Sequence, residues 1–192
     1  MTDFVLTSGM VCRPFRSPWG AFPTRGFQLS TGISSNAILL GRVCSLDVNT
    51  DTNADQILPS SQTAGVVMST AIVGVAADSP SGGAVGTTNT RGTVISVWEA
   101  NPHVEFRAQT QGATLQSSSV GKAKALVWDS TLTIHKVDLS NSTLINVRVV
   151  VTQNIDNIGD SGGAVAFRFL AQTPPAGDST VSRSVLAFYG RG

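Results

Sequence analysis

The segment from 103 to 108 alternates between polar and apolar residues. Its apolar positions are Val104, Phe106 and Ala108, and its polar positions are His103, Glu105 and Arg107. A period of two predicts a β-strand with one buried and one solvent-facing side. The same pattern, or a run of β-branched residues, predicts further strands at 38–46, 65–77 (one or two strands), 92–98, 124–128, 131–137, 146–151 and 164–170.

These segments recur between Gly, Ser, Asn and Pro signals, and no long stretch has the spacing of an amphipathic helix. The pattern therefore predicts an all-β fold, a single β-barrel or β-sandwich domain. Strand order is not visible in the sequence, so barrel and sandwich both stay open. No repeat of fixed period is apparent along the chain.

The ends of the chain differ from its middle. Residues 1–35 are rich in Pro, Arg and aromatic side chains without strand or helix periodicity, which predicts an extended N-terminal arm. Residues 36–172 form the β-domain, and 173–192 form a short C-terminal tail. The arm either folds back on its own domain or docks on a neighbouring subunit or another protein. The tail either returns to the core or docks on a partner. Arg and aromatic residues are typical of binding hot spots, so the candidate anchors are Phe15, Arg16, Trp19, Phe22 and Arg25.

Composition narrows the possible partners. Only 13% of the 192 residues are charged and the net charge is +1, so a generic nucleic-acid binder is not expected. The apolar run 64–77 is too short and too polar to cross a membrane. We find no secretory signal, so a reducing cytoplasm is expected. Cys12 and Cys44 could pair, but nothing demands it, and ordinary packing of both thiols is expected. A surface with so little charge suggests that partners cover much of it.

The sequence Gly159-Asp160-Ser161-Gly162-Gly163 matches the nucleophile segment of chymotrypsin-like proteases. A triad would take its base from His103 or His135 and its acid from Asp129 or Asp138. The short spacing from His135 to Ser161 does not fit two protease barrels, and Asp, Ser and Gly are also common turn residues. We therefore expect no enzyme, and keep a compact serine hydrolase using Ser161 as the least favoured alternative.

No cofactor or metal ion is expected. Neither histidines nor cysteines have metal-ligand spacing, and the acidic residues Asp47, Asp51 and Asp55 lack the closing positions of a calcium loop. The glycine-rich stretch 82–86 lacks the residues of a phosphate-binding loop.

Three stretches carry a resemblance to a known class of proteins. They are Ile72-Val73-Gly74-Val75-Ala76-Ala77, then the strand 94–99 followed by Asn101-Pro102 and Phe106, and the turn Trp128-Asp129-Ser130-Thr131 before a final strand at 146–151. In this pattern, over about 36–170, the chain resembles the decoration, cement or head-stabilisation proteins of tailed bacteriophages.

The resemblance implies a structural virion protein on the outer surface of an icosahedral capsid. Such a protein, commonly a homotrimer, clamps neighbouring subunits of the major capsid protein. Another virion β-module, such as a connector or a fibre or receptor-binding domain, is the alternative. Under the leading hypothesis, deleting residues 1–30 is expected to leave a folded β-domain that no longer binds heads.

Overall fold

The computed structural model describes residues 11–30, 38–47, 56–60, 65–67, 71–78, 94–143 and 147–170. This part of the chain is all-β, as predicted, with one short 3-10 turn at Ser117–Ser119. The strands are β1 Arg13–Arg16, β2 Thr24–Leu29, β3 Val43–Leu46, β4 Gln56–Pro59, β5 Gly65–Val66, β6 Ile72–Ala76, β7 Val94–Glu99, β8 Glu105–Gln111, β9 Ala123–Asp129, β10 Ile134–Asp138, β11 Val147–Asn154 and β12 Ala164–Phe169.

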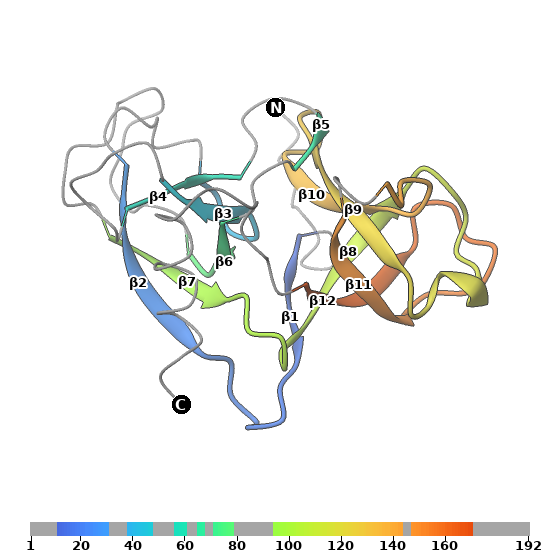
Figure 1. The fold of residues 1–192 in the computed structure, drawn as a ribbon, viewed down its shortest axis with the longest axis horizontal. Helices are drawn as coiled ribbons and strands as arrows, with labels where there is room; N and C mark the ends of the chain where they lie inside the picture. The colour runs from blue at the N-terminus through green and yellow to red at the C-terminus, as the bar shows by residue number, and fades with distance from the viewer. Residues whose placement is uncertain are drawn as a thin grey trace, which may run out of the picture.

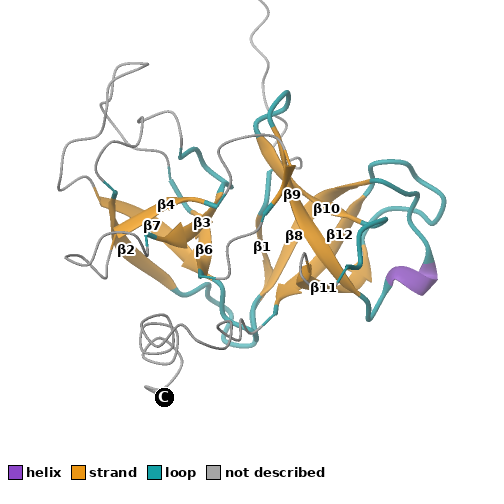
Figure 2. Ribbon diagram, turned by 45° about the horizontal axis from the view of Figure 1, so that its top comes forward, coloured by secondary structure: helices purple, strands orange, loops and turns teal. Residues whose placement is uncertain are grey.

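The strands belong to two sheets that lie side by side (Figures 1 and 2). One sheet is a closed barrel of five strands in the order β2-β4-β3-β6-β7, on the left in Figure 1. The other sheet has seven strands and lies on the right. The sequence had left barrel and sandwich open; the structure has a closed barrel and, beside it, a second sheet that the sequence pattern did not separate.

Five strands of the larger sheet also pair in a ring. The order β8-β10-β9-β11-β12 returns to β8, because β12 pairs with β8 as well as with β11. We call this set the second ring. The remaining strands, β1 and β5, are added to its outside, on β8 and β9 respectively.

The barrel and the second ring have the same topology. In each, the first strand pairs in parallel with the third and antiparallel with the fifth, while the second pairs with the third and the fourth. The fourth and fifth strands form the last antiparallel pair. The chain is therefore a tandem repeat of one five-stranded unit.

The equivalence extends to individual residue pairs. The pair Val43↔Val75 corresponds to Ala123↔Val150, and Cys44↔Gly74 corresponds to Lys124↔Val149. The next pairs, Ser45↔Ile72 and Ala125↔Val147, follow a register shift at the same place in both units. A shared irregularity of this kind is stronger evidence of a common design than strand order alone, because bulges tend to persist within a fold.

A glycine turn leads into the second strand of each unit. Gly41 and Gly121 have nearly equal positive φ angles, 82° and 79°. The N–H of Gly41 donates to the Ala76 carbonyl (2.9 Å), as that of Gly121 donates to the Val151 carbonyl (2.8 Å). Both turns need a left-handed residue, which glycine adopts at low cost.

Two apolar clusters fill the interior. The cluster of the barrel includes Phe27, Leu29, Ile57, Ile95 and Val97. The larger cluster holds the three stacked or edge-on rings of the second ring, Phe106, Phe167 and Phe169, together with residues such as Cys12, Val43 and Val75 from outside that ring. Its core therefore crosses the boundary between the two sheets.

Polar contacts also join the two sheets. The Val43 N–H at the start of β3 donates to Nδ1 of the fully buried His135 on β10 (3.1 Å). The Arg42 guanidinium lies 3.7 Å from the ring centroid of Trp128 on β9, and Trp128 in turn contacts the His135 ring. A hydrogen bond and a cation–π contact thus fix the barrel against the second ring.

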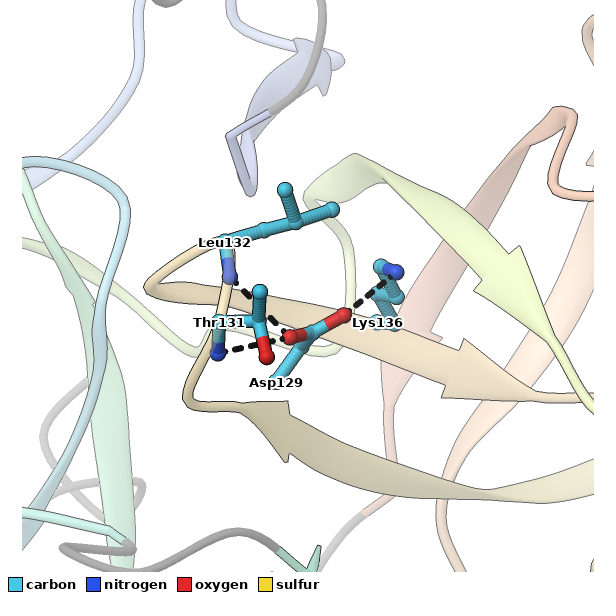
Figure 3. Close-up of polar contacts among 4 residues, drawn as sticks. All are labelled: Asp129, Thr131, Leu132 and Lys136. Carbon is cyan, nitrogen blue, oxygen red and sulfur yellow. Dashed lines mark hydrogen bonds and ion pairs between the residues drawn. The ribbon is translucent and has the colours of Figure 1, made fainter.

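The β9–β10 hairpin is held by Asp129 (Figure 3). Its carboxylate accepts the N–H groups of Thr131 (2.9 Å) and Leu132 (3.0 Å) and pairs with the Lys136 ammonium (2.6 Å). The carboxylate thus provides acceptors for two backbone N–H groups that have no strand partner in the turn.

Most strands after residue 64 lie close to their predicted positions, whereas three strands were not predicted. These are β1, β2 and β4. Two of them lie in the predicted arm of residues 1–35: β1 pairs with β8 and β2 is part of the closed barrel. The described part of the arm is therefore extended but folded along its own chain, one of the two alternatives open from the sequence. Deleting residues 1–30 would remove two strands, so the folded remnant expected from the sequence does not fit this structure.

Candidate binding surface at the β1–β2 turn

Among the described residues, the turn between β1 and β2 carries the two most exposed aromatic residues. It lies at the bottom of Figure 1, where it connects the strand on the second ring to the first strand of the barrel. Ser17 organises it: its hydroxyl accepts the Trp19 N–H (3.2 Å) and its carbonyl accepts the Gly20 N–H (3.3 Å). Gly20 has a φ of 71°, so the sequence Pro18-Trp19-Gly20 suits a tight turn.

Trp19 and Phe22 project from this turn. The Trp19 side chain is 58% exposed and Phe22 is 37% exposed. The Trp19 ring meets His103 edge-on, with 6.0 Å between ring centroids, so the exposed indole is positioned by a residue just before β8. Large apolar side chains held in place at the surface are typical of protein-binding sites.

A shallow depression of about 420 Å³ lies beside this turn, next to His103, the ring partner of Trp19. Its lining residues are Arg16, Ser17, Pro18, His103, Glu105 and Arg168. Arg168 and Glu105 form an ion pair of 3.1 Å, and the Arg168 side chain keeps 43% exposure. Two guanidinium groups and one carboxylate give this depression a net positive charge, which favours an acidic partner group next to an apolar one.

The structure brings four of the five predicted anchors to this region. Phe15 is half-buried on β1 beneath the Arg16 guanidinium, which lies 4.8 Å from its ring centroid. Trp19 and Phe22 are the exposed aromatics. Arg25 lies on β2, over the ring of the buried Phe27 (5.4 Å), and so belongs to the barrel wall rather than to the turn. His103 and Arg168 complete the surface but come from distant segments, so sequence spacing gave no signal for them.

A second depression, of about 570 Å³, lies on the second ring and is polar. Its lining includes Gln116, Ser118, Lys122, Lys124 and Ser142. The Lys124 ammonium already donates to the Leu139 carbonyl. The one large apolar residue that lines this site, Leu139, is buried, so the turn is the better candidate for a protein partner.

Ser161 lies on an exposed turn between β11 and β12. Its neighbours hold the turn: Asp160 accepts the Asn157 N–H (3.1 Å), Asp156 accepts the Ala164 N–H (2.8 Å), and Gly162 has a φ of 77°. In the described residues the Ser161 hydroxyl has no hydrogen bond to either histidine. His135 is enclosed between the two sheets, and His103 packs against Trp19. The Asp-Ser-Gly-Gly sequence here builds a turn.

Burial favours the neutral forms of the buried histidine and of the two buried cysteines. Burial, and to a lesser extent the charge of the nearby Arg42, lowers the pKa of His135 to about 3. Burial raises the pKa of the Cys12 and Cys44 thiols, and both cysteines are free. Thiols of this kind are poor nucleophiles and metal ligands, in line with the packing role expected for them.

No metal-ligand cluster of three or more His, Cys, Asp or Glu residues occurs within the described ranges. Asp51, Asp55, the glycine-rich stretch 82–86 and the tail 173–192 lie outside those ranges. In the same part of the chain, no helix is long and apolar enough to span a membrane.

Comparison with protein-family models, curated proteins and solved structures finds no match for this chain. The function therefore has to be argued from the site itself.

Proposed function

We propose that this chain is a structural virion protein that binds the outer surface of an icosahedral phage capsid and clamps neighbouring major capsid subunits. The observation that carries the proposal is the β1–β2 turn, which carries the exposed Trp19 and Phe22 and borders the positive depression of Arg16 and Arg168. The sequence pattern of phage decoration proteins supports the same assignment.

The mechanism is thermodynamic and needs no cofactor, nucleic acid or membrane. A protein that binds only the assembled shell stabilises it by mass action. Contacts that are weak singly become strong when repeated over a lattice, because each bound copy raises the effective concentration of the next contact. A homotrimer made in the host cytoplasm would present three such turns to the shell, consistent with binding at a three-fold position.

Heads assembled without this protein provide the test. Replacing Trp19 and Phe22 together by Ala is expected to weaken binding at least about thirtyfold, since a hot-spot side chain contributes about 2 kcal/mol. The measurement is co-sedimentation of labelled protein with heads across a concentration series. The matched control is Ile158→Ala, which removes a 67% exposed side chain from the β11–β12 turn. Wild-type affinity in the double variant, or equal loss in the control, would contradict the proposal.

A further inference from the structure

The first strand of each repeat has an outer edge, and among the described residues only one of the two edges has an added strand paired to it. β1 pairs with β8 at Glu105, Phe106 and Arg107. The equivalent residues of β2 are Thr24, Arg25 and Gly26, since the pair Arg25↔Val97 corresponds to Phe106↔Phe167 through the matched pairs of the two rings. Thr24, Arg25 and Gly26 are all exposed. In β8, by contrast, Phe106 is buried, and Glu105 and Arg107 on either side of it are half-buried.

The backbone N–H and C=O groups of Thr24 and Gly26 point away from β7, towards the other edge of β2. The Glu99 N–H donates to the Pro23 carbonyl (3.0 Å), which makes 23 and 99 a hydrogen-bonded pair. In an antiparallel ladder such pairs alternate, so Thr24 and Gly26 direct their N–H and C=O groups to the opposite edge. Within the described residues that edge is used only further along, where Gln28 and Leu29 pair with β4. A free edge of this kind accepts an added strand.

The repeat also indicates where a strand would come from. The Ala100 N–H donates to the Val73 carbonyl (2.8 Å), and the Leu170 N–H donates to the Arg148 carbonyl (2.9 Å) in the equivalent place. After Ala100 the chain crosses, within a few residues, to the first strand of the next ring. The same step repeated after Leu170 would lead to the barrel of another copy, whose first strand is β2 with its free edge.

The chain after Leu170 suits this role by sequence. Residues 181–189, Val-Ser-Arg-Ser-Val-Leu-Ala-Phe-Tyr, are rich in β-branched and aromatic side chains and follow Pro174-Pro175. The ten residues 171–180 that precede it can reach at most about 33 Å when extended, at about 3.3 Å per residue. β1 shows that the equivalent edge takes a strand supplied from across the boundary between two units.

We propose that residues 181–189 of a second copy add to the edge of β2 at Thr24–Gly26, so that each copy completes the barrel edge of its neighbour. The exchange is head-to-tail, and closes into a ring when the rotation between copies permits. It involves only copies of this chain, so its test uses purified protein without heads and stands apart from the test of capsid binding.

A photo-crosslinking amino acid at position 24 gives the direct test. Copies carrying it are mixed with full-length chains labelled with ¹⁵N, irradiated and digested with trypsin. We expect cross-links from position 24 to the labelled tryptic peptide 184–191. The same probe at the exposed Ser118 is the control and is expected to yield about tenfold less of that product, because only a docked segment has a high effective concentration. Cross-links confined to one copy, or equal yields at 24 and 118, would overturn the proposal.

Blocking the edge gives an independent readout. Thr24→Pro removes the outward N–H at a position where an edge strand tolerates proline, while Thr24→Ala keeps it. By light scattering after size exclusion, Thr24→Ala is expected to keep the oligomeric mass of the wild type, and Thr24→Pro is expected to fall to the 19.9 kDa of one chain. A wild-type protein that is itself 19.9 kDa, or a folded Thr24→Pro protein with unchanged mass, would overturn the proposal.

Discussion

The barrel and the second ring share topology and register, yet they differ in what surrounds them. The second ring carries β1 on its first strand, β5 on its second and a core with three packed phenylalanines. The barrel has a smaller apolar cluster, in which Phe27 is the only aromatic residue described, and an exposed edge on β2. The same five-stranded unit thus occurs twice. In the second ring the edge of the first strand is covered by β1, whereas in the barrel the equivalent edge of β2 has no partner among the described residues.

The two units are also interleaved along the chain. Strand β1 precedes the barrel strands in the sequence and β5 lies between two of them, yet both pair with strands of the second ring. The seam of Arg42, Trp128 and His135 then joins the two units. Substitutions in the two units and at the seam between them should therefore have unequal effects, and three predictions test this, from the largest effect to the smallest.

The two glycine turns provide the largest contrast. A Cβ on Gly41 would lie 2.7 Å from the Val11 Cβ and 2.9 Å from the Cys12 carbonyl oxygen, whereas a Cβ on Gly121 would meet nothing within 4 Å. Gly121→Ala is expected to cost about 1 kcal/mol, from its positive φ alone. Gly41→Ala is expected to cost about 3 kcal/mol, because the segment leading into β1 must also shift.

Urea unfolding of both variants measures this contrast. Equal losses at Gly41 and Gly121 would mean that residues 11–12 do not press on the barrel turn in solution, and the packing of the two rings described above would be wrong.

The buried histidine gives the barrel–ring seam a pH dependence. Burial holds the pKa of folded His135 at about 3, below the 6.5 of an unfolded histidine. As the pH falls, the unfolded chain binds the proton first, so the stability that His135 contributes is complete above about pH 6.5 and is lost towards pH 3. Between pH 7 and pH 5 this loss is about 2 kcal/mol.

A glutamine at position 135 removes this titration while keeping an acceptor for the Val43 N–H. His135→Gln is therefore expected to lose about 2 kcal/mol less than wild type between pH 7 and pH 5. The control is His103→Gln, at the exposed histidine beside Trp19. If the free energy of unfolding falls by the same amount between pH 7 and pH 5 for His135→Gln and for the wild type, His135 is not held neutral at the seam.

The sequence pattern predicted the second ring better than the barrel, and the reason is physical. Strands such as β8 and β12 have a clear period of two or a β-branched run, so local pattern and burial agree. In β2, Phe27 and Leu29 alternate with polar residues and were a usable signal, but the preceding Pro and Arg residues favoured an arm. β1 contains Pro14 and exists only because β8 offers an edge.

The repeat could not be seen in the sequence, because few equivalent positions of the two units hold the same residue and the distance along the chain between equivalent residues is not constant. Gly41 and Gly121 differ by 80 positions, Val75 and Val150 by 75, and Val97 and Phe167 by 70. Loops of different length absorb the change, so no fixed period survives along the chain. For the candidate surface, the exposed Trp19 and Phe22 followed from residue type, whereas the contribution of His103 and Arg168 required the fold.

The hairpins of the two units give the smallest contrast. In the second ring, Asp129 holds its own turn through two backbone N–H groups and Lys136 (Figure 3), whereas Asp47, after β3 of the barrel, binds the Ser30 hydroxyl beyond β2. The hydrogen bond from Lys136, followed by that from the Leu132 N–H, lowers the pKa of Asp129. The stability from this carboxylate is therefore complete above the ordinary pKa of an aspartate and is lost as the pH falls through the lower folded value.

Asp129→Asn keeps the shape of the side chain but loses its charge. It is expected to cost about 1 kcal/mol at pH 7, because the ion pair is only partly shielded from water. A double-mutant cycle with Lys136→Gln separates the ion pair from the two backbone bonds, since only the ion pair is lost in both single variants. If Asp129→Asn costs nothing at pH 7, or costs as much at pH 2 as at pH 7, the charge of Asp129 does not hold this turn. The second ring would then owe its hairpin to strand pairing alone, as a local turn needs only the ladder between β9 and β10 to form.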